Sequence, residues 1–517
     1  MKTPKNKLKK LLLWKPDIRF VAVFSVVICV LLLIPLLRMA FYAVPWYDDY
    51  NFGKFVKNFL DEDYDLLSAL KGAVYCAKTQ WWAWQGTYSA SFFNSLMPAV
   101  WGEKYYFLGP VFLILILFFS VWILAGTFAR DVLQGQGASS IVLQSVMAAM
   151  VVVLLYSAPD GFYWYVGGIC YVGMHSFLVL LIAIWMKLMT YRKWASTIIL
   201  VPLSLIGALL AGGATYVTAL QGLLVGISAV LAGALLRNKR TILLLPSILV
   251  YAFGFYKNVT APGNNVRLSS LQSQGLDAVS AVGRSFKEAF WHIGDFSGVI
   301  TLVILILLAP IIWQMLQKSD YNFKYPGLLL AWSFCLYATG FTPSLYALGH
   351  PGLARTLNAV KITYQILLIA NEVYWLGWLQ RKLKKTNEFT LFGWQCRKIQ
   401  KERDSSGSGA PIAFYLIMGI LMVGIFVLAP NQITGFSSYG AYYYIHSGEA
   451  YNYHQEYLER VEIIKNSVDI AIVEPYHYRP WILSVGELSD NYNSGANRAI
   501  ALWYDKQAVI CQDAETE

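Results

Sequence analysis

Apolar residues occur along this chain in long stretches that are separated by shorter polar segments. A helix needs roughly 20 mostly apolar residues to cross a bilayer. Eleven stretches approach or exceed that length, at about 20–41, 104–128, 140–158, 166–188, 197–213, 216–235, 241–256, 296–316, 326–341, 357–379 and 411–429. The pattern therefore predicts an all-α polytopic membrane protein with about eleven transmembrane helices.

The polar segments between these stretches differ in charge. More than half of the 41 Lys and Arg residues lie in the N-terminal segment and in every second segment after it. Basic residues mark the cytoplasmic side of membrane proteins, so we expect a multi-pass protein of the plasma (cytoplasmic) membrane. An odd number of spans then leaves the N-terminus cytoplasmic and the C-terminus extracytoplasmic.

Four segments are long enough to have their own structure. They are the first outer loop 43–103, an outer loop 257–295, a cytoplasmic loop 380–410 and the tail 430–517. We divide the chain into a transmembrane domain, 1–429, and an extracytoplasmic C-terminal domain, 430–517. The tail combines a polar helical stretch at 454–466 with DIAIVEPY at 469–476, which reads as a buried strand, so we expect a small α/β fold.

The first outer loop alternates apolar and polar residues with helical spacing. Phe52, Phe55, Val56 and Phe59 follow this spacing, and the pattern repeats over 66–77. Both segments are too polar to span a bilayer and suit helices that lie along the membrane interface.

Composition narrows the class of protein. The chain has 517 residues, of which 57% are hydrophobic and 14% charged, whereas about 25% charge is usual in soluble domains. The net charge of +11 would suit nucleic acid, but the excess lies in the cytoplasmic segments and the outer segments are net acidic. We therefore expect a lipid bilayer and no nucleic acid as partner.

Several short motifs fall on the outer side of the predicted topology. They are DDYNFG at 48–53, WWAWQGTYSASFF at 81–93, DGFYWYVGGICYVG at 160–173, APGNNVR at 261–267 and GFTPSLYALGHPGLARTLN at 340–358. In this order they resemble a bacterial family of polytopic membrane proteins with a conserved domain of unknown function. That family is similar to GT-C-type glycosyltransferases. One departure is Thr87, where the resemblance leads us to expect arginine.

The resemblance implies an enzyme with a GT-C-like transmembrane domain. It would move a sugar from a polyprenyl-phosphate donor to a glycan, lipid or wall-polymer acceptor on the extracytoplasmic side, by inverting transfer. An acid of the first outer loop acts as the base in such enzymes, and Asp48 and Asp49 match that position. We prefer Asp48 as base, with Asp49 orienting it or binding sugar hydroxyls; alternatively, the two acids cap a helix.

Two outer arginines are suited to the donor phosphate. The planar guanidinium can donate two hydrogen bonds to a phosphate at once, and Arg267 and Arg355 both lie on the outer side. Each is equally well explained as an arginine that extends its charge to the membrane surface.

Further polar and aromatic residues near these motifs are candidates for substrate binding. Aromatic faces can stack on sugars, although aromatic residues also populate the interface of any membrane protein, and an amide can bind a sugar or the chain itself. The substrate-binding candidates are Asn264, Tyr163, Trp164, Trp84, Tyr88 and His350.

No metal-binding motif is present, since the six histidines lack zinc spacing. Two adjacent acids could hold a divalent cation through oxygen ligands, but adjacent residues are a poor pair for this. Two other functions stay open. The chain could transport or flip lipid-linked sugars, although it shows no internal repeat, or it could be a non-catalytic membrane scaffold.

Overall fold

The computed structural model describes residues 10–60, 64–135, 137–191, 194–270, 275–385, 388–391, 394–397, 410–428 and 436–512. Nearly all regular structure in these residues is helical. The longer helices are α2 (Ile18–Met39), α6 (Leu108–Gly126), α7 (Gly137–Val153), α9 (Met174–Thr190), α10 (Trp194–Gly212), α11 (Tyr216–Leu235), α12 (Leu245–Val259), α14 (Ala278–Phe296), α15 (Val299–Met315), α16 (Pro326–Ala338), α18 (Ala354–Lys385), α19 (Ile412–Leu428) and α22 (Glu449–Asn466). The basic segment 1–9 and most of the predicted cytoplasmic loop, including 398–409, lie outside the described residues.

Shorter elements connect and cover these helices. They are η1 (Ala40–Tyr42), α3 (Asp48–Leu60), α4 (Leu66–Ala83), α5 (Tyr88–Ser95), η2 (Pro98–Trp101), η3 (Glu103–Tyr105), η4 (Thr127–Val132), η5 (Pro159–Tyr163), α8 (Tyr165–Gly168), η6 (Ile169–Gly173), η7 (Lys239–Leu244), α13 (Gly263–Ser270), η8 (Leu316–Lys318), α17 (Thr342–Leu348), β1 (Glu388–Leu391), β2 (Trp394–Arg397), α21 (Ser437–His446), β3 (Ile470–Val473), α23 (Gly495–Trp503) and β4 (Ala508–Cys511).

Seven helical segments are long and apolar enough to cross a membrane, judged by length and composition. They are Ile18–Tyr42, Glu103–Val132, Tyr165–Thr190, Trp194–Gly212, Tyr216–Leu235, Lys239–Val259 and Pro326–Leu348. Helices α14 and α15 meet at a bend of 79° and would make an eighth span if they cross together, and Gly137–Val153 and Ile412–Ile425 are shorter apolar helices. The all-α membrane class is therefore confirmed, whereas the number of eleven spans stays a prediction.

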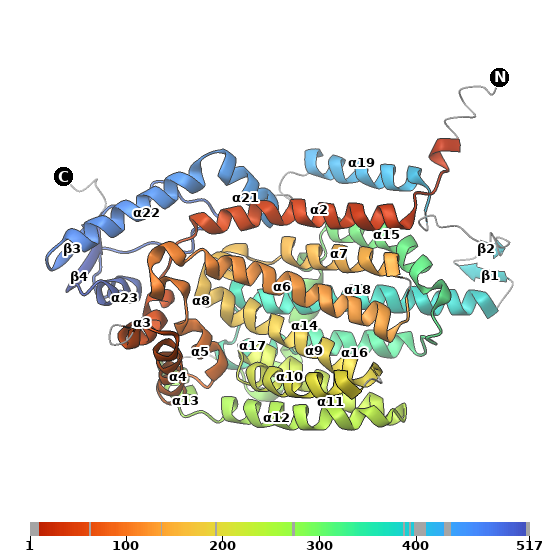
Figure 1. The fold of residues 1–517 in the computed structure, drawn as a ribbon, viewed down its shortest axis with the longest axis horizontal. Helices are drawn as coiled ribbons and strands as arrows, with labels where there is room; N and C mark the ends of the chain where they lie inside the picture. The colour runs from red at the N-terminus through yellow and green to blue at the C-terminus, as the bar shows by residue number, and fades with distance from the viewer. Residues whose placement is uncertain are drawn as a thin grey trace, which may run out of the picture.

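The long helices lie side by side and point along one direction (Figure 1). Helices α3, α4, α13 and α23 gather at one end of this bundle, and the N-terminus and the β1–β2 hairpin lie toward the other. The end that carries α3 is called the α3 end below. Since α6 follows η3 and α9 follows α8, which both lie at the α3 end, α6 and α9 run in the same direction and end at the opposite end.

Residues 43–103, predicted above to be the first outer loop, fold into helices over the part that the structure describes, as their spacing predicts. Helix α3 buries Tyr50, Gly53, Val56 and Leu60 on one face. Helix α4 packs on α3 and leaves an apolar face exposed, made of Leu66, Leu67, Leu70, Val74 and Tyr75.

The tail residues that the structure describes contain helices and a two-stranded parallel sheet, in which Ile470 of β3 pairs with Ala508 of β4. The expected strand is present but is only half buried. Its residues alternate, with Ile470 and Ile472 more than half exposed and Ala471 and Val473 buried. One face of β3 therefore packs on the tail, and the prediction of a fully buried strand is wrong.

The tail packs against the α3 end. The Tyr50 hydroxyl lies 3.4 Å from the Tyr457 hydroxyl of α22, and Trp503 of α23 packs edge-on against the Tyr50 ring. The Tyr504 hydroxyl donates to Glu103. The tail is thus fixed beside the first outer loop, next to the acids at the start of α3.

Candidate functional site

Asp49 is a buried structural anchor. Its side chain has no exposed surface. One carboxylate oxygen accepts from the Trp46 backbone N–H (2.9 Å) and the Tyr106 hydroxyl (2.7 Å), and the other accepts from the Val166 N–H (2.8 Å). Burial raises the pKa of Asp49 to about 7, and these three donors oppose the rise by favouring the ionised form. Asp49 therefore ties α3 to the segment before α6 and to α8.

Asp48 has different surroundings although it is the adjacent residue. Its side chain is half-buried, and the guanidinium groups of Arg355 and Arg267 lie within electrostatic range, although among the described residues neither forms a salt bridge with it. Burial raises its pKa, while Arg355, a hydrogen bond from Asn51 and Arg267 each act to lower it. Successive helical residues point about 100° apart, so the two adjacent acids differ: Asp49 is fully buried, and Asp48 lies within electrostatic range of the two arginines.

Arg355 is held over Trp164. The guanidinium carbon lies 5.1 Å from the ring centroid, within the range of a cation–π contact. The first turn of α18 is fixed by Asn358, whose amide accepts from the Ser157 N–H (2.8 Å) and donates to the Ser157 carbonyl (2.9 Å). These contacts join the motif at 340–358 to the motif at 160–173 and set the position of Arg355.

The WQG motif at 84–86 and the APGN motif at 261–264 pack closely together, with a glycine of each at the contact. A Cβ atom on Gly86 would lie 1.8 Å from the Asn258 carbonyl oxygen, and one on Gly263 would lie 2.6 Å from the Trp84 backbone nitrogen. Only glycine permits this approach of the two backbones. The contact also brings Arg267 near Trp84, with 5.7 Å between the guanidinium carbon and the ring centroid.

Asn264 holds this junction together. Its oxygen accepts from the Gly86 N–H (2.8 Å) and the Tyr216 hydroxyl (2.5 Å), and its nitrogen donates to the carbonyl groups of Asn258 and Val259. The amide is thus engaged by the chain, which is the second of the two roles that the sequence left open.

A cluster of buried polar groups next to the arginines is not evident from the sequence. The Cys170 thiol donates to the Asn94 side-chain oxygen at 3.2 Å and lies within electrostatic range of Asp48, Arg355 and Arg267. Among the described residues, no hydrogen-bond partner is found for these buried polar atoms: Thr87 Oγ1, Ser89 Oγ, Ser91 Oγ, Asn94 Nδ2 and Trp164 Nε1. Unpaired buried polar groups are costly, so their concentration in and beside α5 makes this region a candidate binding site.

The cluster gave only a weak signal in the sequence. Helix α5 reads YSASFFNS, in which small polar residues alternate with aromatic ones. Such a pattern is also typical of ordinary helix packing. Thr87, the departure from the expected motif, belongs to the cluster and is 2% exposed.

The remaining predicted site residues are Tyr163, Tyr88 and His350, and each makes a hydrogen bond with the protein backbone. Tyr163 is buried and its hydroxyl donates to the Leu36 carbonyl. The Tyr88 hydroxyl donates to the Leu209 carbonyl (2.7 Å). His350 is exposed, and its Nδ1 accepts from the Gly352 N–H. These contacts engage the hydroxyl groups of both tyrosines with the protein backbone.

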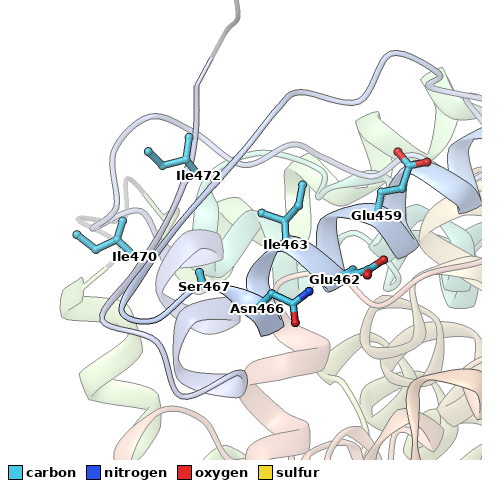
Figure 2. A pocket seen from close by; sticks show the side chains of 7 residues that line it. All are labelled: Glu459, Glu462, Ile463, Asn466, Ser467, Ile470 and Ile472. Atoms are coloured by element: carbon cyan, nitrogen blue, oxygen red, sulfur yellow. The ribbon is translucent and has the colours of Figure 1, made fainter.

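Two hollows elsewhere on the molecule are not lined by these residues. One is an open groove of about 790 Å³ on the tail, between α22 and β3, with Glu459, Glu462 and the exposed isoleucines of β3 along it (Figure 2). The other, of about 370 Å³, lies between the ends of α6 and α9 and the start of α7. Within the described part of the chain, no group of three or more His, Cys, Asp or Glu residues is placed to hold a metal ion.

Comparison of this chain with protein-family models, with curated proteins and with solved structures returns no match. The arrangement of the side chains at the α3 end is therefore the basis for assigning a function.

Proposed function

We propose that this protein is a membrane glycosyltransferase that moves a sugar from a polyprenyl-phosphate donor to a cell-surface glycan, lipid or wall-polymer acceptor. The observation that carries the proposal is the separation of roles between two adjacent acids. Asp49 accepts three structural hydrogen bonds, whereas Asp48 lies within electrostatic range of two arginines, near a cluster of buried polar groups without hydrogen-bond partners.

In this proposal Asp48 is the general base. Its carboxylate takes the proton of the acceptor hydroxyl as the hydroxyl oxygen attacks the anomeric carbon. The bond from that carbon to the phosphate oxygen breaks, and the polyprenyl phosphate leaves with the electron pair. Attack from the face opposite the phosphate inverts the anomeric centre.

Arg355 and Arg267 would receive the departing phosphate. Fixed cations aimed at charge that develops during the reaction stabilise the transition state. Both guanidinium groups are positioned by aromatic rings, through Trp164 and Trp84. In this proposal Asn94 Nδ2 and Trp164 Nε1, which are buried and have no hydrogen-bond partner among the described residues, would bind sugar hydroxyls.

The proposal includes the topology. With eleven spans in the plasma membrane, a cytoplasmic N-terminus and an extracytoplasmic C-terminus, the α3 end faces the outside. The tail, 430–517, then acts as an extracytoplasmic domain beside the site, where it can limit access of the acceptor. A divalent cation is not needed for this chemistry, since the two arginines supply the positive charge.

The role of Asp48 is tested by replacing it with asparagine and comparing the result with the same replacement at a control acid. Asp48→Asn should lower transfer from a polyprenyl-phosphate sugar by roughly 10²- to 10⁴-fold in membranes of normal protein content. Asp505→Asn is the matched control, because Asp505 is an exposed acid at the same end, 83% exposed beside Lys57. Full transfer by the Asp48→Asn protein would exclude the role as base.

One feature of the fold favours a second function, transport of the same lipid-linked sugars. The α14–α15 pair is bent by 79° at Ser297–Gly298, and broken helices form binding sites in transporters. A cysteine placed at position 48 distinguishes the two, since a transporter would expose it to polar thiol reagents from both sides of the membrane and an enzyme from one side only.

A further inference from the structure

A second site lies at the end of the bundle opposite Asp48. The cavity of about 370 Å³ is lined by Trp122, Ile123, Thr127, Arg130, Asp131, Gln144, Lys187 and Tyr191. Its size falls in the range of small-ligand pockets. Because Tyr106, just before α6, contacts Asp49 and α6 rises 1.5 Å per residue, the cavity at the far end of α6 is about 30 Å from that acid.

A local change in helix geometry helps to form this cavity. The α6 helix continues as a π-helix, η4, over Thr127–Val132, and short π segments occur often at functional sites. A Cβ atom on Gly126 would lie 2.6 Å from Gln144 Oε1 and 2.8 Å from Arg130 Nη2. Glycine at this position therefore lets the amide and the guanidinium approach the end of α6 together.

The cavity is lined by two cationic side chains, Arg130 and Lys187, and by one acid, Asp131, which is hydrogen-bonded. The Asp131 carboxylate accepts from the Tyr191 hydroxyl at 3.1 Å. Arg130 makes one long contact of 3.5 Å with the Gly126 carbonyl, and the Lys187 ammonium lies 5.6 Å from the Tyr191 ring centroid. Within the described part of the chain, neither Arg130 nor Lys187 has a carboxylate within salt-bridge distance.

We infer that this cavity binds the phosphate of an anionic lipid headgroup. Arg and Lys donors together with the Gln144 amide suit a phosphate. A lipid is favoured over a free anion because Ile123, on the wall, is 40% exposed on an apolar helix surface, and Trp122 stands beside it. Basic pockets between transmembrane helices bind such headgroups, and aromatic residues mark the level at which headgroups lie.

The competing explanation is that the cations only complement the C-terminal dipoles of α6 and α9. The two explanations differ in whether phosphate is bound. Native mass spectrometry of the full chain, released from vesicles of phosphatidylcholine with a minority of phosphatidylglycerol, counts the lipids that remain on the protein. The test variant is Arg130→Gln/Lys187→Gln, and the control is Arg237→Gln/Lys239→Gln, which removes two exposed cations from the α11–α12 connection at the same end of the bundle.

We expect the wild type and the control to retain phosphatidylglycerol in preference to phosphatidylcholine. The test variant should lose that preference, by roughly fivefold for each cation removed. Equal retention of both lipids by the wild type would overturn the inference, as would equal losses in the test and control variants. If the double variant does not fold, lipid retention is measured on the single variant Lys187→Gln instead.

A second arm separates lipid from soluble anion. Inorganic phosphate at millimolar concentration should leave the unfolding temperature of the delipidated protein unchanged, while phosphatidylglycerol should raise it in a manner that depends on Arg130 and Lys187. A rise produced by inorganic phosphate alone, and abolished in the test variant, would assign the cavity to a soluble anion and overturn the lipid assignment.

Discussion

The two ends of the α6–α9 helix pair differ in how their charged side chains are paired. At the α3 end, Asp49 is fully buried and accepts from three donors, and Asp48 lies within electrostatic range of two arginines without a salt bridge to either among the described residues. At the other end, Arg130 and Lys187 stand in a cavity whose acid is engaged with a tyrosine. A buried charge costs free energy unless it is paired or hydrogen-bonded. The charges that the fold leaves without such partners are therefore the ones available to molecules outside the chain.

The largest effect should come from removing the buried acid. Asp49→Ala leaves the Trp46 and Val166 N–H groups without an acceptor, each of which costs about 1–3 kcal/mol, while the Tyr106 hydroxyl keeps the Tyr163 carbonyl at 3.1 Å, so the free energy of unfolding should fall by roughly 2 kcal/mol or more. Asp48→Ala should change stability by far less, because Asp48 accepts no comparable set of donors. Unfolding in detergent micelles measures both, and equal losses would remove the distinction between the two acids.

The next largest effect should come from the junction that positions Arg267. In Gly86→Ala the new Cβ meets the Asn258 carbonyl at 1.8 Å, and overpacking of this kind costs about 1–3 kcal/mol or more. The matched control is Gly283→Ala, in α14, where nothing lies within 4 Å of the new Cβ. That substitution should be neutral or stabilising by up to about 1 kcal/mol. If both variants unfold like the wild type, the two loops do not depend on this contact.

A smaller effect should appear in the pH profile of transfer. Arg355 lowers the pKa of Asp48 against the larger raising effect of burial. The base works when ionised, so activity is lost as the pH falls through this pKa. Arg355→Gln removes a lowering influence, so the pKa rises and the acid limb should move to higher pH, with a fall in rate of roughly 10²-fold.

The pH profile of transfer by Arg267→Gln compares the effects of the two arginines on the pKa of Asp48. Arg267 lowers the pKa of Asp48 less than Arg355 and Asn51 do. Arg267→Gln should therefore shift the acid limb less than Arg355→Gln does. A larger shift for Arg267→Gln would contradict the arrangement described above.

The smallest effect should come from an exposed ion pair at the α3 end. Lys465 and Glu103 lie 3.0 Å apart, and the lysine side chain is 55% exposed. Exposed pairs contribute up to about 1 kcal/mol, so Lys465→Ala should lower the free energy of unfolding by no more than that. A loss as large as that of Asp49→Ala would mean that the tail depends on this pair for its position.

Much of the fold could be predicted from local patterns. Long apolar stretches predict membrane helices because each residue contributes to burial independently of the fold. Helical spacing also predicted α3 and α4, although it did not reveal which face of each would be buried. The strand at 469–476 was found, but its exposed face could not be, since burial of Ile470 and Ile472 depends on what packs above them.

The candidate site was predictable only in part. Motif order pointed to Asp48, Arg267 and Arg355, which the structure brings within electrostatic range of one another. Asn264, Tyr163 and Tyr88 were predicted as binding residues, and the structure engages their polar groups with the chain. Asn94 and Cys170 were missed because a buried asparagine and a buried cysteine have no distinctive spacing.

The sequence by itself determined the membrane class, the helical content and the set of polar residues from which a site could be built, because hydropathy and spacing act over a few residues at a time. Only the tertiary structure decided which of two adjacent acids is buried, which glycines let backbones touch, and which cations lack a carboxylate partner. These outcomes depend on groups more than fifty residues apart along the chain, such as Asp49 with Tyr106 and Val166. Whether a polar group is satisfied by the protein or left for a ligand is therefore a property of the folded chain.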